Sequence, residues 1–169
     1  MAVAHFSSSR ISGFTLVELM VTIAVAAILL SVGVPSLTSL YESYRSKSEI
    51  SRIEQALSFA RNQAISYGIE VKVCGYQSDT GCAANFDDGL KVYTTASGSE
   101  KVLRVVEGID SKDAIVGSNV GFHADGLSNT TGEVTFIYCP SKQANGSRSV
   151  TVSSSGMIKY GADGLACPN

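Results

Sequence analysis

A single carboxylate, Glu18, lies inside the most apolar stretch of the chain. The stretch runs from Phe14 to Val34 as FTLVELMVTIAVAAILLSVGV and carries no other charged side chain. An ionised carboxylate in an apolar medium is costly unless a cation neutralises it. No lysine, arginine or histidine occurs between Arg10 and Arg45, so this part of the chain offers Glu18 no side-chain partner.

An α-amino group is the candidate partner. Residues 1–13 are short and polar, contain no acidic residue and end in Gly13. Cleavage between Gly13 and Phe14 would give Phe14 an N-terminal ammonium, which is protonated near neutral pH. The ammonium of a neighbouring subunit could then pair with Glu18 and set the register of helices that pack side by side. The residues alone leave a second interpretation open, a signal anchor whose carboxylate lies near the membrane surface.

The apolar stretch is long enough to cross a membrane. Its 21 residues match the ~20 residues that a helix needs to span a hydrocarbon core. A secretory signal peptide has a shorter apolar core that ends at a small-residue cleavage site. Here the break precedes the apolar run, at Gly13. We therefore expect residues 14–34 to stay in the mature protein as a transmembrane helix, and residues 1–13 to be a leader.

Four cysteines, all downstream of the apolar stretch, could form two disulfides. They are Cys74, Cys82, Cys139 and Cys167, and no two of them form the C-x-x-C pair of a zinc or redox site. An even number of cysteines outside the cytoplasm favours disulfides. Three pairings exist, and we expect Cys74–Cys82 with Cys139–Cys167, which closes the shortest loops. The longer loop would contribute about 3 kcal/mol of stability in the chain-entropy description.

No set of residues has the spacing of a catalytic centre. His123 is the one histidine after the leader, and no nucleophile motif such as G-x-S-x-G accompanies it. Asp87, Asp88 and Asp125 do not have the spacing of an EF-hand and predict turns. We expect neither an enzyme nor a cofactor or metal site.

Two kinds of element follow the apolar stretch. Over residues 35–67, apolar side chains recur at steps of three and four, which predicts an amphipathic helix half that ends at Gly68. Pro35 should kink or interrupt the helix, since proline removes a backbone donor. From Ile69 onward, alternating segments and glycine-containing turns predict six to eight antiparallel strands. The expected fold is α+β, a long N-terminal helix packed on an antiparallel β-sandwich head of residues 68–169.

The segment GFTLVELM, Gly13–Met20, resembles the prepilin peptidase signature of type IV pilins and type II secretion pseudopilins. The resemblance implies cleavage between Gly13 and Phe14, N-methylation of Phe14, and a role for Glu18 in assembly. It makes a simple signal anchor the weaker interpretation. The implied partners are the prepilin peptidase, inner-membrane lipid, and other minor and major pilins. The implied location is the inner membrane, with one span and a periplasmic head, and after assembly the pilus at the cell surface.

The rest of the chain resembles the GspH/FimT branch of the pilin-like proteins. The order and spacing of several segments carry this resemblance, namely Ile53 to Cys74, GLKVY at 89–93, the strand at 134–139, and RSVTV at 148–152. It implies a minor type IV pilin that primes pilus assembly or forms part of the pilus tip, for twitching motility or adhesion. A type II secretion pseudopilin is an alternative, because the N-terminal signature is common to both.

DNA capture for uptake is a further alternative. Some FimT-type pilins bind DNA through a G-R-x-R-like pattern, and the matching stretch Gly146–Ser149 keeps one arginine, Arg148. Lys142, Arg148 and Lys159 could form a small cationic patch, but residues 114–169 carry no net charge and the chain's formal charge is −2. DNA binding needs several phosphates neutralised at once. The charge balance therefore disfavours DNA as a partner.

Overall fold

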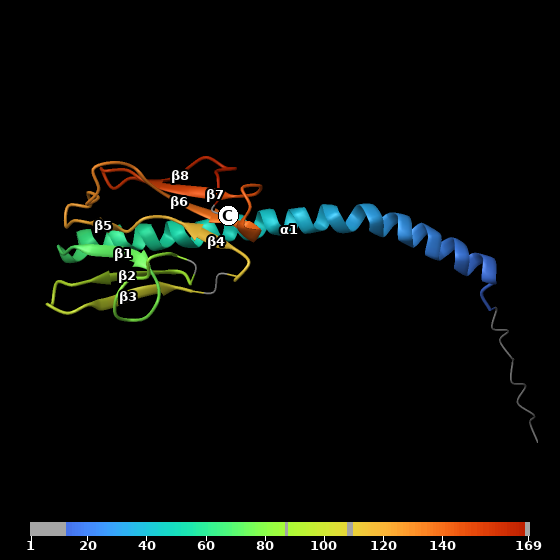
Figure 1. Cartoon of the computed structure of the whole chain (residues 1–169), viewed down its shortest axis with the longest axis horizontal. Coiled ribbons are helices and arrows are strands. Elements are labelled where there is room, and N and C mark those ends of the chain that lie inside the picture. The colour runs from blue at the N-terminus through green and yellow to red at the C-terminus, as the bar shows by residue number, and fades with distance from the viewer. Residues whose placement is uncertain (1–12, 87, 108–109, 168–169) are drawn as a thin grey trace, which may run out of the picture. The chain divides into compact units, whose positions relative to one another are not determined.

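The computed structural model describes residues 13–86, 88–107 and 110–167 (Figure 1). The side chain of Pro35 is also not described. The expected leader, apart from Gly13, and the turn residue Asp87 lie outside the described residues. The chain divides into two compact units, Met1–Leu40 and Tyr41–Asn169, and each is described by itself.

One α-helix, α1 (Leu16–Tyr67), runs through 52 residues. Thr15 caps its start, since the Thr15 hydroxyl oxygen accepts the N–H of Glu18 at 3.2 Å. The interruption expected at Pro35 does not occur, because α1 continues through this position. A proline removes only one backbone donor, so the helical hydrogen bonds before and after this position can continue.

The helix ends at Gly68, as the sequence predicts. Gly68 has a φ of +63°, a left-handed conformation that glycine adopts without a steric penalty. The N–H of Ile69 then donates to the carbonyl of Ala64 at 3.2 Å, which is the longer bond of a Schellman cap.

The described part of the first unit consists of residues 13–40. Every side chain described there is exposed. By length and composition, α1 could cross a membrane, and its most apolar window has no buried residue. Such a surface requires lipid or other apolar helices around it.

The second unit combines the C-terminal part of α1 with two four-stranded antiparallel sheets (Figure 1). The first sheet has the order β3-β2-β1-β5 and is built from β1 (Val71–Gly75), β2 (Leu90–Thr94), β3 (Lys101–Val106) and β5 (Val120–Phe122). The second has the order β4-β6-β7-β8 and is built from β4 (Ala114–Val116), β6 (Val134–Cys139), β7 (Arg148–Val152) and β8 (Ile158–Tyr160). A single 3₁₀ turn, η1 (Pro140–Lys142), follows β6. The eight strands confirm the predicted α+β fold.

One hydrophobic core joins α1 to both sheets. The helix contributes alanines at intervals of four, Ala56, Ala60 and Ala64, which are fully buried and let the strands approach the helix backbone closely. Leu57 fills the space beside them and is also fully buried. Tyr44 belongs to the predicted apolar stripe but is exposed, so the buried part of the stripe begins later than the sequence pattern suggests.

Replacing Leu57 with alanine should lower the free energy of unfolding of the head by about 2–5 kcal/mol, because it leaves a cavity between α1 and the sheets. Urea unfolding in detergent, followed by tyrosine fluorescence, measures this. Leu127→Ala is the matched control, since Leu127 is 46% exposed and should cost clearly less. Equal losses in the two variants would contradict the core position of Leu57.

Candidate functional site

The segment from Gly13 to Glu18 presents its side chains to the surroundings. Phe14 is 82% exposed and lies just ahead of α1. Glu18 is the acidic residue of the first helical turn, where a carboxylate interacts favourably with the helix dipole. Among the described residues no cation lies within ion-pair distance of Glu18, so an exposed carboxylate is surrounded by exposed apolar side chains. That arrangement suits a partner outside this chain.

Gly13 has open space around it. A methyl group built at this position would meet no atom within 4 Å among the described residues. The fold therefore does not require glycine here. A requirement for glycine at this position would come from whatever recognises the segment.

Two disulfides lie in the head. They join Cys74 to Cys82 and Cys139 to Cys167, with sequence separations of 8 and 28 residues. These pairs close the shortest loops, as expected from the sequence. The first bond ties the end of β1 to the loop that leads toward β2, and the second ties the end of β6 to the C-terminal segment.

A buried lysine is hydrogen-bonded to the loop closed by the first disulfide. Lys91, on β2, is fully buried, and its ammonium donates to the carbonyls of Ser78 at 3.1 Å and Asp79 at 3.4 Å. It also forms an ion pair with Glu100. A buried ammonium is tolerated only when it is paired and hydrogen-bonded in this way. Lys91 therefore couples the position of the disulfide loop to the sheet.

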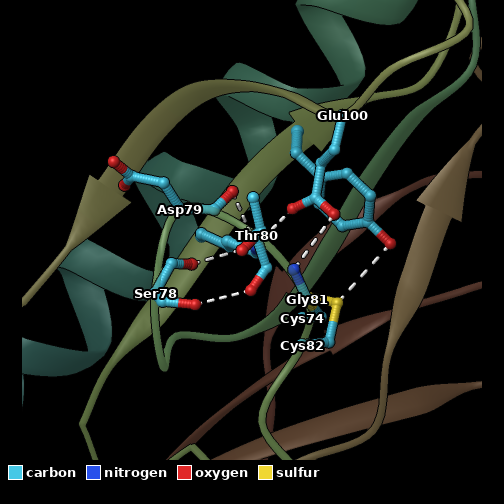
Figure 2. The surroundings of a disulfide bond; sticks show 9 residues. Cys74, Ser78, Asp79, Thr80, Gly81, Cys82 and Glu100 are labelled. Atoms are coloured by element: carbon cyan, nitrogen blue, oxygen red, sulfur yellow. Dashed lines mark hydrogen bonds and ion pairs between the residues drawn. A yellow bond between two sulfur atoms is a disulfide. The ribbon is translucent and has the colours of Figure 1, made fainter.

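Glu100 completes this cluster. Its second carboxylate oxygen accepts the N–H of Gly81 at 3.3 Å (Figure 2), so the carboxylate bridges Lys91 and the loop. The hydrogen bond from Lys91 lowers the pKa of Glu100, since it stabilises the ionised form. The sequence gives no sign of this pair. Lys91 occupies a polar position of a strand in which apolar and polar residues alternate, and such a position usually faces solvent.

A second buried charge, Asp113, links α1 to the sheet that contains β6. Its carboxylate accepts hydrogen bonds from Arg45 of α1 at 2.8 Å and from the N–H of Ser141 at 2.8 Å. The Tyr138 hydroxyl donates to the same carboxylate. Burial raises the pKa of the Tyr138 phenol, and the bond to Asp113 raises it further. Sequence reasoning missed this cluster as well, because its members are far apart along the chain.

The residues considered for DNA contact do not form a free cationic patch. Arg148 pairs with Asp163, and the Lys159 ammonium lies 3.9 Å from Glu133. Lys142 is exposed in η1. Two of the three cations thus have an acidic neighbour that offsets their charge.

The other titratable residues considered from the sequence lie in turns. Asp125 accepts the N–H of Leu127 at 3.0 Å, as an Asx turn does, and His123 and Asp88 are exposed. Within the described ranges, no group of three or more histidine, cysteine or acidic side chains is placed to hold a metal ion.

Comparison with known families identifies the chain's relatives. A sequence profile for the family described as Type II transport protein GspH matches residues 49–156. The chain belongs to the GspH family. A second profile, for the prokaryotic N-terminal methylation motif, matches residues 8–34 and so contains Gly13, Phe14 and Glu18. No curated protein matches the sequence.

Solved structures of a minor pilin and a minor pseudopilin share the fold. The type IV minor pilin FimU of Pseudomonas aeruginosa superposes with a TM-score of 0.60 at 21% identity, over 76% of this chain and 96% of FimU. The minor pseudopilin EpsH from the type 2 secretion system of Vibrio cholerae gives a TM-score of 0.53 at 14% identity, over 69% of this chain and 96% of EpsH. The fold and the N-terminal motif are those of minor pilins and pseudopilins.

Replacing Glu100 with glutamine should lower the free energy of unfolding near pH 7 by about 2 kcal/mol, because Lys91 loses its charged acceptor. The folded-state pKa of Glu100 is lowered, so the pair's contribution is present above the unfolded-state pKa and is lost as the pH falls through the folded-state pKa. The difference from wild type should therefore shrink as the pH falls below the ordinary glutamate pKa of about 4.3. Urea unfolding across this range measures it.

Glu133→Gln is the control, since Glu133 and Lys159 form an exposed pair at 3.9 Å that should contribute little. A Glu100→Gln variant as stable as wild type at neutral pH would contradict the coupling of Lys91 to the loop.

Proposed function

We propose that this GspH-family chain is a minor type IV pilin, a structural subunit that primes pilus assembly or forms part of the pilus tip. One observation carries the proposal. Glu18 is an exposed carboxylate without a cation in the described chain, on a helix whose neighbouring side chains are apolar and exposed. It lies four residues beyond Phe14 in a segment matched by the methylation motif.

The chain is made as a precursor and then processed. It inserts with residues 1–13 in the cytoplasm, residues 14–34 in the inner membrane and the head in the periplasm. Arg10 is the one fixed positive charge of the leader and agrees with this orientation. The prepilin peptidase cleaves between Gly13 and Phe14 and methylates the new N-terminus. Among the described residues nothing lies close to the Gly13 position, which agrees with access by an enzyme.

Assembly moves the processed helix from lipid into a bundle of similar helices. The Glu18 carboxylate pairs with the N-terminal ammonium of a neighbouring subunit, and this attraction is stronger in an apolar surrounding than in water. Dispersion between the apolar side chains of residues 14–34 supplies most of the remaining attraction. Residues 35–67 continue the helix and bring it onto the head, residues 68–169, which contacts other minor and major pilins.

A type II secretion pseudopilin is the second candidate. The family's own description names a type II transport protein, and the EpsH fold is similar. Both candidates need the same cleavage and the same carboxylate. They differ in whether the subunit is recovered from surface filaments or is required for secretion. DNA capture is not favoured, because Arg148 and Lys159 lie beside Asp163 and Glu133.

Gly13→Val should leave an uncleaved precursor in the inner membrane, because the peptidase must accommodate the residue before the scissile bond. Valine itself meets no obstacle in the described structure. An immunoblot of membrane fractions distinguishes precursor from mature chain. Gly33→Val, which also lies in open space, is the control and should be cleaved normally. Normal processing of Gly13→Val would contradict the assigned site.

Glu18→Ala should be cleaved but should enter filaments at about a tenth of the wild-type level or less, since each 1.4 kcal/mol lost is a tenfold change. Glu18→Gln removes the charge but keeps a side chain that can still cap the helix start, because glutamine serves this capping position as glutamate does. It therefore tests the charge alone. Both variants should fail if the charge is needed. Quantitative immunoblots of sheared filaments provide the measurement, with Glu42→Ala as control. Full incorporation of Glu18→Gln would show that the carboxylate charge is dispensable.

A further inference from the structure

The first sheet of the head ends at β3, and no described strand pairs with its outer side. With six residues, β3 is as long as any strand of the head. A free edge of this length presents a row of backbone N–H and C=O groups that can pair with another extended chain. The outer edge of β3 is therefore a candidate binding surface.

The hydrogen-bond register identifies the backbone groups at this edge. Along an antiparallel strand, the backbone groups of successive residues bond alternately to the strand on one side and to the strand on the other. The N–H of Tyr76 donates to the carbonyl of Gly89 at 3.0 Å, so odd-numbered residues of β2 bond to β1 and even-numbered ones bond to β3. Leu90 pairs with Val106, and Val105 consequently directs its N–H and C=O away from β2.

The charges on β3 indicate what the edge would bind. Lys101 is exposed, and Arg104 stacks its guanidinium 5.6 Å from the ring centroid of Phe59. Among the described residues, neither cation has a carboxylate within ion-pair distance. Other strand cations do, as the pairs Lys91–Glu100 and Lys159–Glu133 illustrate. Acidic side chains on an incoming strand would match Lys101 and Arg104.

A hollow next to the start of β3 could receive an apolar side chain of the same segment. It has a volume of about 320 Å³, and Tyr67, Ile69, Lys101 and Leu103 contribute to its walls. Tyr67 is 69% exposed there, which leaves a large aromatic surface uncovered. Side-chain pockets beside an open sheet edge give strand addition its specificity.

A second copy of this chain matches the edge less well than an acidic segment does. It brings a second Lys101 and a second Arg104, and a register that sets Leu103 opposite Val105 places the two copies of Arg104 opposite each other, where like charges are destabilising. An acidic segment of a different protein supplies the opposite charge.

We propose that β3 binds an extended, acidic segment of a partner protein by strand addition to the sheet. The backbone of Val105 supplies the central hydrogen bonds, and Lys101 and Arg104 select acidic side chains. This interaction does not depend on incorporation into a filament.

The test uses the full chain in detergent micelles and a synthetic nine-residue peptide of alternating valine and threonine that carries two glutamates. A peptide with lysines in place of the glutamates is the matched probe. Hydrogen–deuterium exchange should slow across residues 101–106 when the acidic peptide is added, and fluorescence anisotropy should show that it binds more tightly than the basic one. Val105→Pro should weaken binding about tenfold, because it removes the outward N–H at a position where proline breaks no sheet hydrogen bond.

If Val105→Pro does not fold, Lys101→Glu decides the question. It should weaken binding of the acidic peptide about threefold, as for an exposed ion pair, and strengthen binding of the basic one. Three results would overturn the proposal: no slowing of exchange at residues 101–106, equal binding of the two peptides, or slowed exchange that depends on protein concentration without peptide, which would indicate self-association.

Discussion

The Glu18 carboxylate needs a cation beside it, and this need is the main constraint on the N-terminal part of the protein. Glu18 lies in the stretch 14–34, whose described side chains are exposed and include no other charged group, and no described cation lies within ion-pair distance of it. Lipid can cover the apolar side chains but cannot neutralise the charge. A carboxylate in that position favours any state in which an ammonium lies beside it. In the proposed account, the cleavage that removes the leader also creates this ammonium on every subunit, so processing and assembly are chemically linked.

In the head, the buried charges of Lys91 and Asp113 have partners within the same chain. Lys91 is surrounded by two carbonyls and Glu100, and Asp113 is surrounded by Arg45, Ser141 and Tyr138. Each cluster joins segments distant in sequence, so removing one member would leave a buried group without its partner. Each disulfide has one cysteine next to a cluster, since Cys82 follows the loop residues that contact Lys91 and Glu100, and Cys139 lies between Tyr138 and Ser141 in the chain. The clusters and the disulfides therefore both stabilise the head, and the outer edge of β3 is left unpaired among the described strands.

Local patterns predicted the helix, its end at Gly68, the strand-rich head and the motif around Glu18, because each depends on neighbouring residues. Period and length predict a helix, and glycine predicts its end. The buried clusters could not be predicted in this way. Lys91 has the sequence position of a surface residue, and its burial depends on a loop and a carboxylate that only the folded chain brings together. For Pro35 the local rule predicted a kink or an interruption, and α1 continues through this position without an interruption.

The exposure of Tyr44 has a similar cause. Its spacing fits the apolar stripe of α1, but spacing does not reveal where the head begins to cover the helix. The buried stripe starts with Ser46 and Ile50, and that boundary depends on the packing of the sheets. The proposed processing site at Gly13 and Phe14 depends on a short sequence motif, and the described fold does not require glycine at position 13.

Mass spectrometry of the protein recovered from sheared surface filaments tests whether the processed N-terminus and Glu18 are needed for assembly. We expect a chain that begins at N-methylated Phe14, with all four cysteines in disulfides, and at most about a tenth of it in filaments of a Glu18→Gln strain. Recovery only from the membrane fraction, or a filament chain that still carries residues 1–13, would contradict the proposed account.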